Sequence, residues 1–201
     1  MSVAGCAPKA PDYSSVLGTT SATTTTTTTP KPVPLSQYLE SIGVTGEPVA
    51  PSGLTDLTVS IPTPPGWSPY TDQKMPPTTV MISKPSKVPN AMLVVFRLHG
   101  DFDPAQVIKH GNDDAQLLPG FTQLDASTAP FNGFPSSMIQ GSYGANEIRL
   151  HSWNRIVIAT GSPPAKQRYL VQLTITSLAA QAAAQSADIE AIIRGFVVAA
   201  K

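Results

Sequence analysis

The chain has 201 residues, with thirteen acidic and thirteen basic side chains and a formal net charge of zero at pH 7. Like charges form no long run, which excludes the clustered basic face that nucleic-acid binding needs. The one cysteine excludes an intramolecular disulfide, and no apolar stretch approaches the roughly 18 residues of a membrane span.

The cysteine, Cys6, follows the small residues Val3-Ala4-Gly5 and precedes a polar segment. Residues 1–6 resemble the end of a signal peptide with a bacterial lipobox, in which Cys6 carries diacylglycerol on its sulfur and an acyl chain on its amino group. A secretory signal also has a basic region and an apolar region of about 7 to 15 residues. Because five residues precede Cys6, we expect the natural precursor to begin upstream. The alternative is an unmodified surface thiol.

Residues 7–34 hold nine threonines, seven of them consecutive, and five prolines. Such a composition cannot bury apolar surface, which predicts a disordered tether. Its 28 residues would span ~30 to ~85 Å, depending on whether they behave as a coil or as a stiff proline-rich spacer. Threonine with proline also suits O-glycosylation, and an unmodified flexible spacer is the alternative.

The remaining segment, residues 35–201, has the length of one domain and can bury roughly 70% of its unfolded surface. Apolar residues at helical spacing predict a short helix over 35–42. Alternation predicts a strand over 57–61 that ends at a proline-rich break. Strands are also expected at 80–83 and 91–98, and the second is apolar on both faces, which is typical of the middle of a covered sheet.

Asp103 and Pro104 give the clearest local signal in the domain. Asp103 suits a helix N-cap, Pro104 suits the first helical position, and Gln106 suits the reciprocal place in a capping box. The predicted helix runs from there to Leu118.

Four further strands and a closing helix follow. Short breaks near Gly144-Ala145-Asn146 and Gly161-Ser162-Pro163-Pro164 predict hairpins and a largely antiparallel sheet. The strands are expected at 121–126, 134–143, 148–159 and 168–176, and the helix from a Ser186 cap to Val197. The predicted fold class is α+β, with six or seven strands packed by helices.

Several short motifs together carry a family resemblance. They are the lipobox at Cys6, the threonine-rich tether, Gly100-Asp101-Phe102-Asp103-Pro104 opening a helix, Leu118-Pro119-Gly120-Phe121 closing it, and Gly133-Phe134 and Gly141-Ser142-Tyr143 on a strand. Their order and spacing resemble the mycobacterial LpqN/LpqT lipoproteins over essentially the whole chain. The resemblance implies a PsbP-like α/β/α sandwich in an exported, acylated protein on the outer face of the cell membrane, whose domain binds something rather than transforms it. It carries no catalytic residue over to this chain.

The residues themselves also argue against an enzyme. His99, His110 and His151 are too scattered for a metal site by spacing, so no metal or cofactor is expected. Asp101 and Asp103 near His99 could form a carboxylate pair, but a helix start explains them without catalysis. No serine lies in a Gly-x-Ser-x-Gly elbow, and a hydrolase with an unrecognised site is therefore the last of our hypotheses.

Aromatic residues give the one hint of a ligand. Trp67 and Tyr70 follow the first predicted strand, and Trp153 lies on a strand whose alternate residues Arg149, His151 and Arg155 are expected to face outward. If Trp67, Tyr70 and Trp153 converge, they would suit an amphiphile with a sugar or anionic head and an apolar tail. Ordinary core packing is the alternative, favoured for Trp67.

Two functions therefore head the list. The first is an anchored domain that binds an envelope lipid or glycolipid in an apolar cleft. The second is a membrane-tethered adaptor that docks on cell-envelope or secretion machinery or on host proteins, with its acylated N-terminus recognised by innate receptors.

Overall fold

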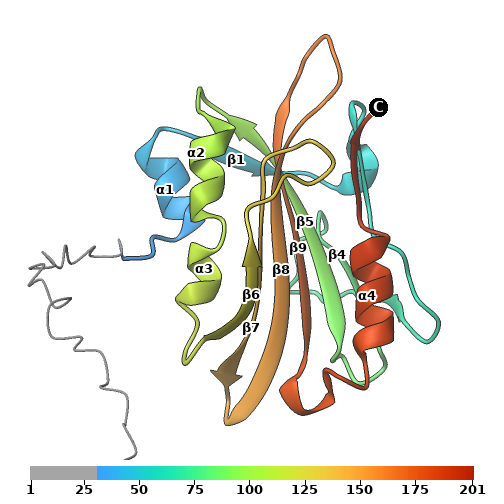
Figure 1. Ribbon diagram of the computed structural model, residues 1–201. Helices are drawn as coiled ribbons and strands as arrows, with labels where there is room; N and C mark the ends of the chain where they lie inside the picture. Colours follow the sequence, from blue (N-terminus) through green and yellow to red (C-terminus); the bar gives the residue numbers. More distant parts are fainter. Residues whose placement is uncertain (1–30) are drawn as a thin grey trace, which may run out of the picture. The chain divides into compact units, whose positions relative to one another are not determined.

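The computed structural model describes residues 31–201, and Cys6 and residues 7–30 of the predicted tether lie outside the described residues. Eight strands of this part form one antiparallel sheet in the order β3-β4-β5-β9-β8-β7-β6, with β1 added on β5 (Figure 1). A second sheet pairs β2 with β10. The strands are β1 Thr45–Pro48, β2 Leu57–Ser60, β3 Ser68–Pro69, β4 Val80–Ser83, β5 Asn90–His99, β6 Thr122–Ser127, β7 Ser136–Ala145, β8 Ile148–Thr160, β9 Arg168–Leu178 and β10 Val197–Ala200.

Long, regularly paired strands form the middle of the main sheet. β8 and β9 pair from Leu150 opposite Leu178 to Thr160 opposite Arg168. Asn146 and Glu147 both have positive φ, 46° and 66°, and connect β7 to β8. Two such residues are the requirement of a tight hairpin turn whose twist matches the strands. The predicted hairpin is confirmed, with its turn one residue beyond the predicted one.

Helices cover both faces of the main sheet. On one face, α1 (Leu35–Ser41) and α2 (Pro104–Val107) pack on Ile156 and Ile158. On the other face, α4 (Ser186–Arg194) packs over Val157 and its neighbours. Consecutive residues of β8 thus belong to opposite cores, as the period of two in a strand requires. The predicted α/β/α sandwich is confirmed, and Figure 1 shows α1 to α3 on one side of the sheet and α4 on the other.

The predicted helix over 104–118 begins as expected and then breaks. Asp103 Oδ1 accepts a hydrogen bond from Ala105 N at 2.8 Å, which confirms the N-cap. The Gln106 side chain instead accepts from Lys109 Nζ, so no capping box forms. The chain divides into α2, η2 (Ile108–His110) and α3 (Asp113–Gln116) at Gly111, where a Cβ would collide with Ser137 Oγ. The helical stretch therefore divides at the residue that packs closely on β7.

The closing helix is shorter than predicted. It ends at Arg194, Gly195 is its C-cap, and Val197 begins β10. Ser186 is its first residue and makes no capping hydrogen bond, because Gln185 occupies the N-cap. β1 and β3 were not predicted either. β1 consists of four exposed residues and β3 of only two residues, so neither shows an alternation of apolar and polar side chains. No helix within residues 31–201 is long and apolar enough to cross a membrane.

Candidate functional site

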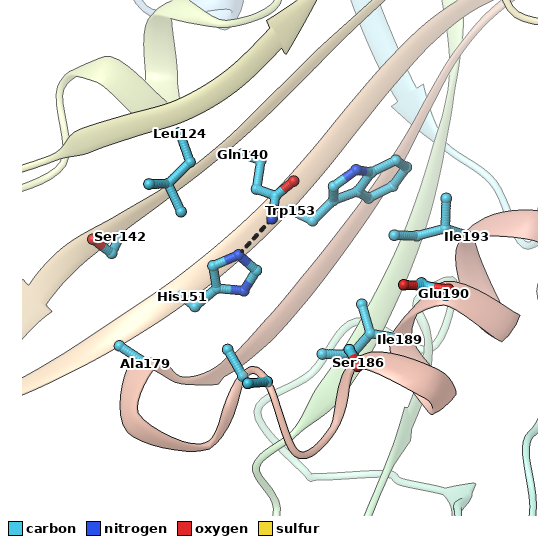
Figure 2. A pocket seen from close by; sticks show the side chains of 12 residues that line it. Leu124, Gln140, Ser142, His151, Trp153, Ala179, Ser186, Ile189, Glu190 and Ile193 are labelled. Atoms are coloured by element: carbon cyan, nitrogen blue, oxygen red, sulfur yellow. Dashed lines mark hydrogen bonds between the residues drawn. The ribbon is translucent and has the colours of Figure 1, made fainter.

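A pocket of about 540 Å³ lies between α4 and the face of the sheet formed by β6, β7 and β8. Figure 2 shows side chains of the sheet on one side and those of α4 and the preceding segment on the other. Leu124 lines the pocket from a register irregularity of β6 between Gln123 and Asp125. The lining consists of Leu124, Gln140, Ser142, His151, Trp153, Ala179, Ala182, Ala183, Ser186, Ile189, Glu190 and Ile193.

His151 is the titratable group at the sheet side of the pocket. The residue is 9% exposed, and its ring is held by two partners. Gln140 Nε2 donates to His151 Nε2 at 2.9 Å, and His151 Nδ1 donates to Ser177 Oγ at 3.4 Å. Burial lowers the pKa of His151, which keeps the ring uncharged near neutral pH.

The rest of the lining is apolar or small. Trp153, Ile189 and Ile193 form an apolar wall between β8 and α4. Leu124 adds an apolar side chain from β6, and alanines of the segment before α4 leave the space open. An apolar wall beside a few hydrogen-bonding groups is typical of sites for small amphiphiles.

The pocket has little charge. Glu190 is the one acidic residue among its described lining side chains, and its carboxylate pairs with Arg194 at 2.9 Å. No cation is among the lining residues in the described part of the chain. Arg149 Nε lies 3.1 Å from Ser142 Oγ of the lining, but this guanidinium also donates to Thr122 Oγ1. The hydrogen-bond partners of His151 are Gln140 and Ser177, not a carboxylate. In a Ser–His–Asp triad a carboxylate would orient the histidine ring.

The three predicted ligand-binding aromatics do not converge. Trp153 lines the pocket. Trp67 is buried in the core, and its Nε1 donates to Asp188 Oδ2 at 3.2 Å on α4. Tyr70 lies beyond β4, where its hydroxyl donates to Asp72, and β5 and β9 separate β4 from the strand that carries Trp153.

The prediction that Arg149, His151 and Arg155 face outward was wrong for two of the three. Arg149 is exposed, but His151 is buried in the pocket. Arg155 is half-buried, with its guanidinium carbon 4.9 Å from the Phe131 ring centroid. The physical reason is that α4 and the loop at 128–135 cover this face of β8, which the alternation of β8 alone does not reveal.

The other predicted polar residues lie in separate places. His110 Nδ1 is 2.9 Å from Asp113 Oδ2, and the His110 ring stacks on the Tyr38 ring. His99 Nε2 is 3.6 Å from Glu47 Oε2 on β1. Asp103 caps α2. Across residues 31–201, no three His, Cys, Asp or Glu side chains gather in an arrangement that could hold a metal ion.

Sequence reasoning missed Gln140 and the alanine-rich segment 179–185. Gln140 gains its role from the register that places it opposite Trp153, beside His151. Apolar residues do not recur at helical or strand spacing in this segment. It could have been identified because it contains no charged or bulky residue just before α4.

The lowered pKa of His151 predicts a loss of stability in acid. As the pH falls below about 6.5, the unfolded chain binds a proton on this residue that the native state resists, so the free energy of unfolding decreases. His151→Asn removes the titrating group and is expected to flatten this decrease between about pH 7.5 and pH 5.5. Urea denaturation of both proteins measures it, and identical slopes against pH would contradict the prediction.

Comparison with known proteins identifies the family. The family described as Probable lipoprotein LpqN matches residues 31–199. A protein named LpqT from Mycobacterium leprae (strain TN) is 68% identical over all of this chain and 92% of that protein. The crystal structure of LpqN of Mycobacterium tuberculosis, described as involved in cell envelope biogenesis, covers 83% of this chain and 97% of that chain at 21% identity, with a TM-score of 0.70. The solution structure of PsbP from Synechocystis sp. PCC 6803 covers 73% of this chain and 95% of that chain at 14% identity, with a TM-score of 0.44. The match over residues 31–199 and the identity across the whole chain show that the protein belongs to the LpqN/LpqT family of lipoproteins.

Proposed function

We propose that this protein is a lipid-anchored lipoprotein of the cell envelope, acylated at Cys6, whose domain binds an envelope lipid or glycolipid. The family supports the anchor, and the description of LpqN as involved in cell envelope biogenesis supports the location. The observation that carries the binding function is the pocket of about 540 Å³ between α4 and the sheet.

The lining of the pocket favours a ligand whose head group is uncharged and carries hydroxyl groups. Gln140, whose amide is held by His151, and Ser142 offer neutral hydrogen-bonding groups along the strands. Trp153, Ile189 and Ile193 offer apolar contact for an acyl chain. No cation is among the lining residues, and Arg149 beside Ser142 already donates to this chain's own hydroxyl groups, so an anionic head would lose its hydration without gaining a free counter-ion. A sugar head keeps its hydrogen bonds and is therefore favoured over the anionic head that the sequence left open.

Native mass spectrometry of the protein expressed from its natural gene and purified from its own membrane tests both parts. We expect an acyl mass on Cys6 and a retained, non-covalent lipid. Ala183→Trp places a large ring in the pocket lining and is expected to reduce the retained lipid about tenfold or more. Ala184→Trp is the matched control, because Ala184 is exposed and outside the lining.

Each outcome tests a separate part of the proposal. An unmodified Cys6 thiol in all three proteins would remove the anchor. Equal retention of lipid by Ala183→Trp and its control, or no lipid in any of them, would remove the pocket as the binding site. Reproducible crosslinking to one envelope protein, with no retained lipid, would favour the adaptor function instead.

A further inference from the structure

His151 and Gln140 form a hydrogen-bonded pair whose polarity depends on the protonation state of the ring. A neutral imidazole has one N–H group and one nitrogen that accepts, whereas a protonated ring has two N–H groups and no acceptor. His151 Nδ1 donates to the buried Ser177 Oγ on β9, so Nε2 is left to accept from Gln140 Nε2 on β7 at 2.9 Å. The ring is thus held from both strands that flank β8.

The oxygen of the Gln140 amide is free to contact a ligand. Because Nε2 is turned toward the ring, Oε1 lies on the side away from His151, as Figure 2 shows. No donor within residues 31–201 forms a hydrogen bond to this oxygen, and Gln140 lines the pocket. While His151 is neutral, a bound head group therefore meets a hydrogen-bond acceptor at this position.

Protonation of His151 reverses the polarity of the pair. The charged ring donates from Nε2, and an amide nitrogen cannot accept that proton, so the Gln140 amide has to turn over and place Oε1 on the ring. Its NH2 group then faces the pocket beside a ring that carries a positive charge. The turn is a rotation about the last side-chain bond of Gln140, whose torsion is broad, and it requires no movement of the strands.

Few other charges face this pair. From α4, Glu190 lines the pocket and forms an ion pair with an arginine one turn later. On β8, Arg149 donates to hydroxyl groups of β6 and β7, and the Arg155 guanidinium lies over two aromatic rings. On β6, Asp125 is exposed, and its Oδ1 accepts from a backbone N–H of its own strand. Among the described residues, β7, β9 and the segment 179–185 add no charged or titratable side chain to the lining. The titration of His151 therefore sets the polarity of the sheet side of the pocket.

We infer that the His151–Gln140 pair makes the pocket select the head group of its ligand according to pH. With neutral His151 the pair presents an oxygen, which accepts from a hydroxyl or ammonium group and opposes an anionic head that has acceptors only. With protonated His151 the pair presents an NH2 group beside a positive charge, which receives an anionic head and opposes an ammonium group.

The selection rests on the proposed function, because it concerns the same pocket. A hydroxyl group can donate or accept, so a sugar head fits both states of the pair. Burial lowers the pKa of His151, so the neutral state prevails at neutral pH and the charged state requires acid.

Calorimetric titration of the full chain with three amphiphiles that share an octyl chain tests the inference. The probes are octylammonium, octane-1-sulfonate and octyl glucoside, each below its micelle-forming concentration. From about pH 7.5 to about pH 5, we expect the sulfonate to bind about tenfold more tightly, the ammonium about tenfold more weakly and the glucoside with little change. In His151→Asn, the affinities for both charged probes are expected to lose this pH dependence. His99→Asn is the matched control, because His99 is exposed and outside the lining, and it is expected to behave like the parent.

Nitrogen NMR of the side chains follows the pair without a ligand. The Gln140 NH2 signals are expected to shift with the same midpoint as the His151 ring. Gln140→Glu places a carboxylate on His151 Nε2, which favours the charged ring and is expected to raise the pKa of His151 by about one unit or more. This variant keeps the inference testable if His151→Asn does not fold, as judged by thermal unfolding.

Octyl glucoside separates failure of the selection from failure of the pocket. If the glucoside binds and both charged probes keep their affinities across this pH range, the selection is wrong and the binding function remains. If none of the three binds, the proposed function fails and the selection fails with it. Gln140 signals that do not follow the ring, or equal pH dependence in the parent and His151→Asn, would also overturn the inference. Glu190→Gln is expected to keep the pH dependence, and its loss there would assign the effect to Glu190 instead.

Discussion

Gly141→Ala is expected to lower the free energy of unfolding by about 1–3 kcal/mol, because β7 and β6 leave no room for a side chain at this position. A Cβ built on Gly141 would lie 2.6 Å from Thr122 O and 2.6 Å from Phe121 Cε2, and would overlap Phe121 Cζ. The ring could rotate away, but Thr122 O belongs to the backbone of the neighbouring strand and can move only with it. For a domain of this size, the Tm is expected to fall by about 2–4 °C for each kcal/mol.

Gly144→Ala is the matched control in the same strand. The nearest atom to a Cβ on Gly144 is Pro119 O at 3.7 Å, an ordinary van der Waals distance. Its effect is expected to stay within about 0.5 kcal/mol. Urea denaturation of both variants measures the difference, and equal losses would show that the contact with β6 is not the cause. Because Thr122 and Leu124 belong to the same edge strand, Gly141→Ala is also expected to reduce retained lipid by displacing one wall of the pocket.

The central strands could be predicted because their information is local. Tyr169, Val171, Leu173 and Ile175 alternate along β9, and all four are buried in the same core cluster. Asp103 likewise identifies the start of α2 through a hydrogen bond to a residue two positions away. In both cases the cause and its structural effect lie within a few residues of each other.

The features that sequence reasoning missed depend on distant contacts. The predicted helix divides at Gly111, which packs against Ser137, 26 positions later in the sequence. Val197 continues the apolar spacing of α4, but it pairs with Ser60 of β2 rather than extending the helix. β3 consists of two residues that take strand geometry only because β4 offers an edge.

The same distinction applies to the candidate site. Trp153 was predicted from its residue type and its strand, whereas Gln140 and His151 become neighbours through the register of β7 on β8. The outward orientation predicted for His151 failed because α4, more than 30 residues later, covers that face. Spacing within one strand can place residues on a face, but it cannot determine whether another element covers that face.

Trp153→Ala and Trp67→Ala are expected to destabilise the domain alike and to differ in lipid binding. Both rings are buried in the same core cluster, so each truncation is expected to cost about 3–5 kcal/mol of unfolding free energy. Trp67→Ala also removes the hydrogen bond to Asp188, which keeps its ion pair with Lys84 at 2.7 Å. Trp153→Ala removes the ring that forms part of the pocket wall and one of the two rings beneath the Arg155 guanidinium.

Lipid retention separates the two variants where stability does not. Trp153 lines the pocket and Trp67 does not, so retained lipid is expected to fall about tenfold or more in Trp153→Ala and to persist in Trp67→Ala. Native mass spectrometry at a temperature below both unfolding transitions measures this difference, and urea denaturation confirms the matched stabilities. The phenylalanine substitutions at both positions repeat the comparison if the alanine variants do not fold. Equal loss of lipid from both variants would attribute the effect to the weakened core, and equal retention would exclude Trp153 from the binding site.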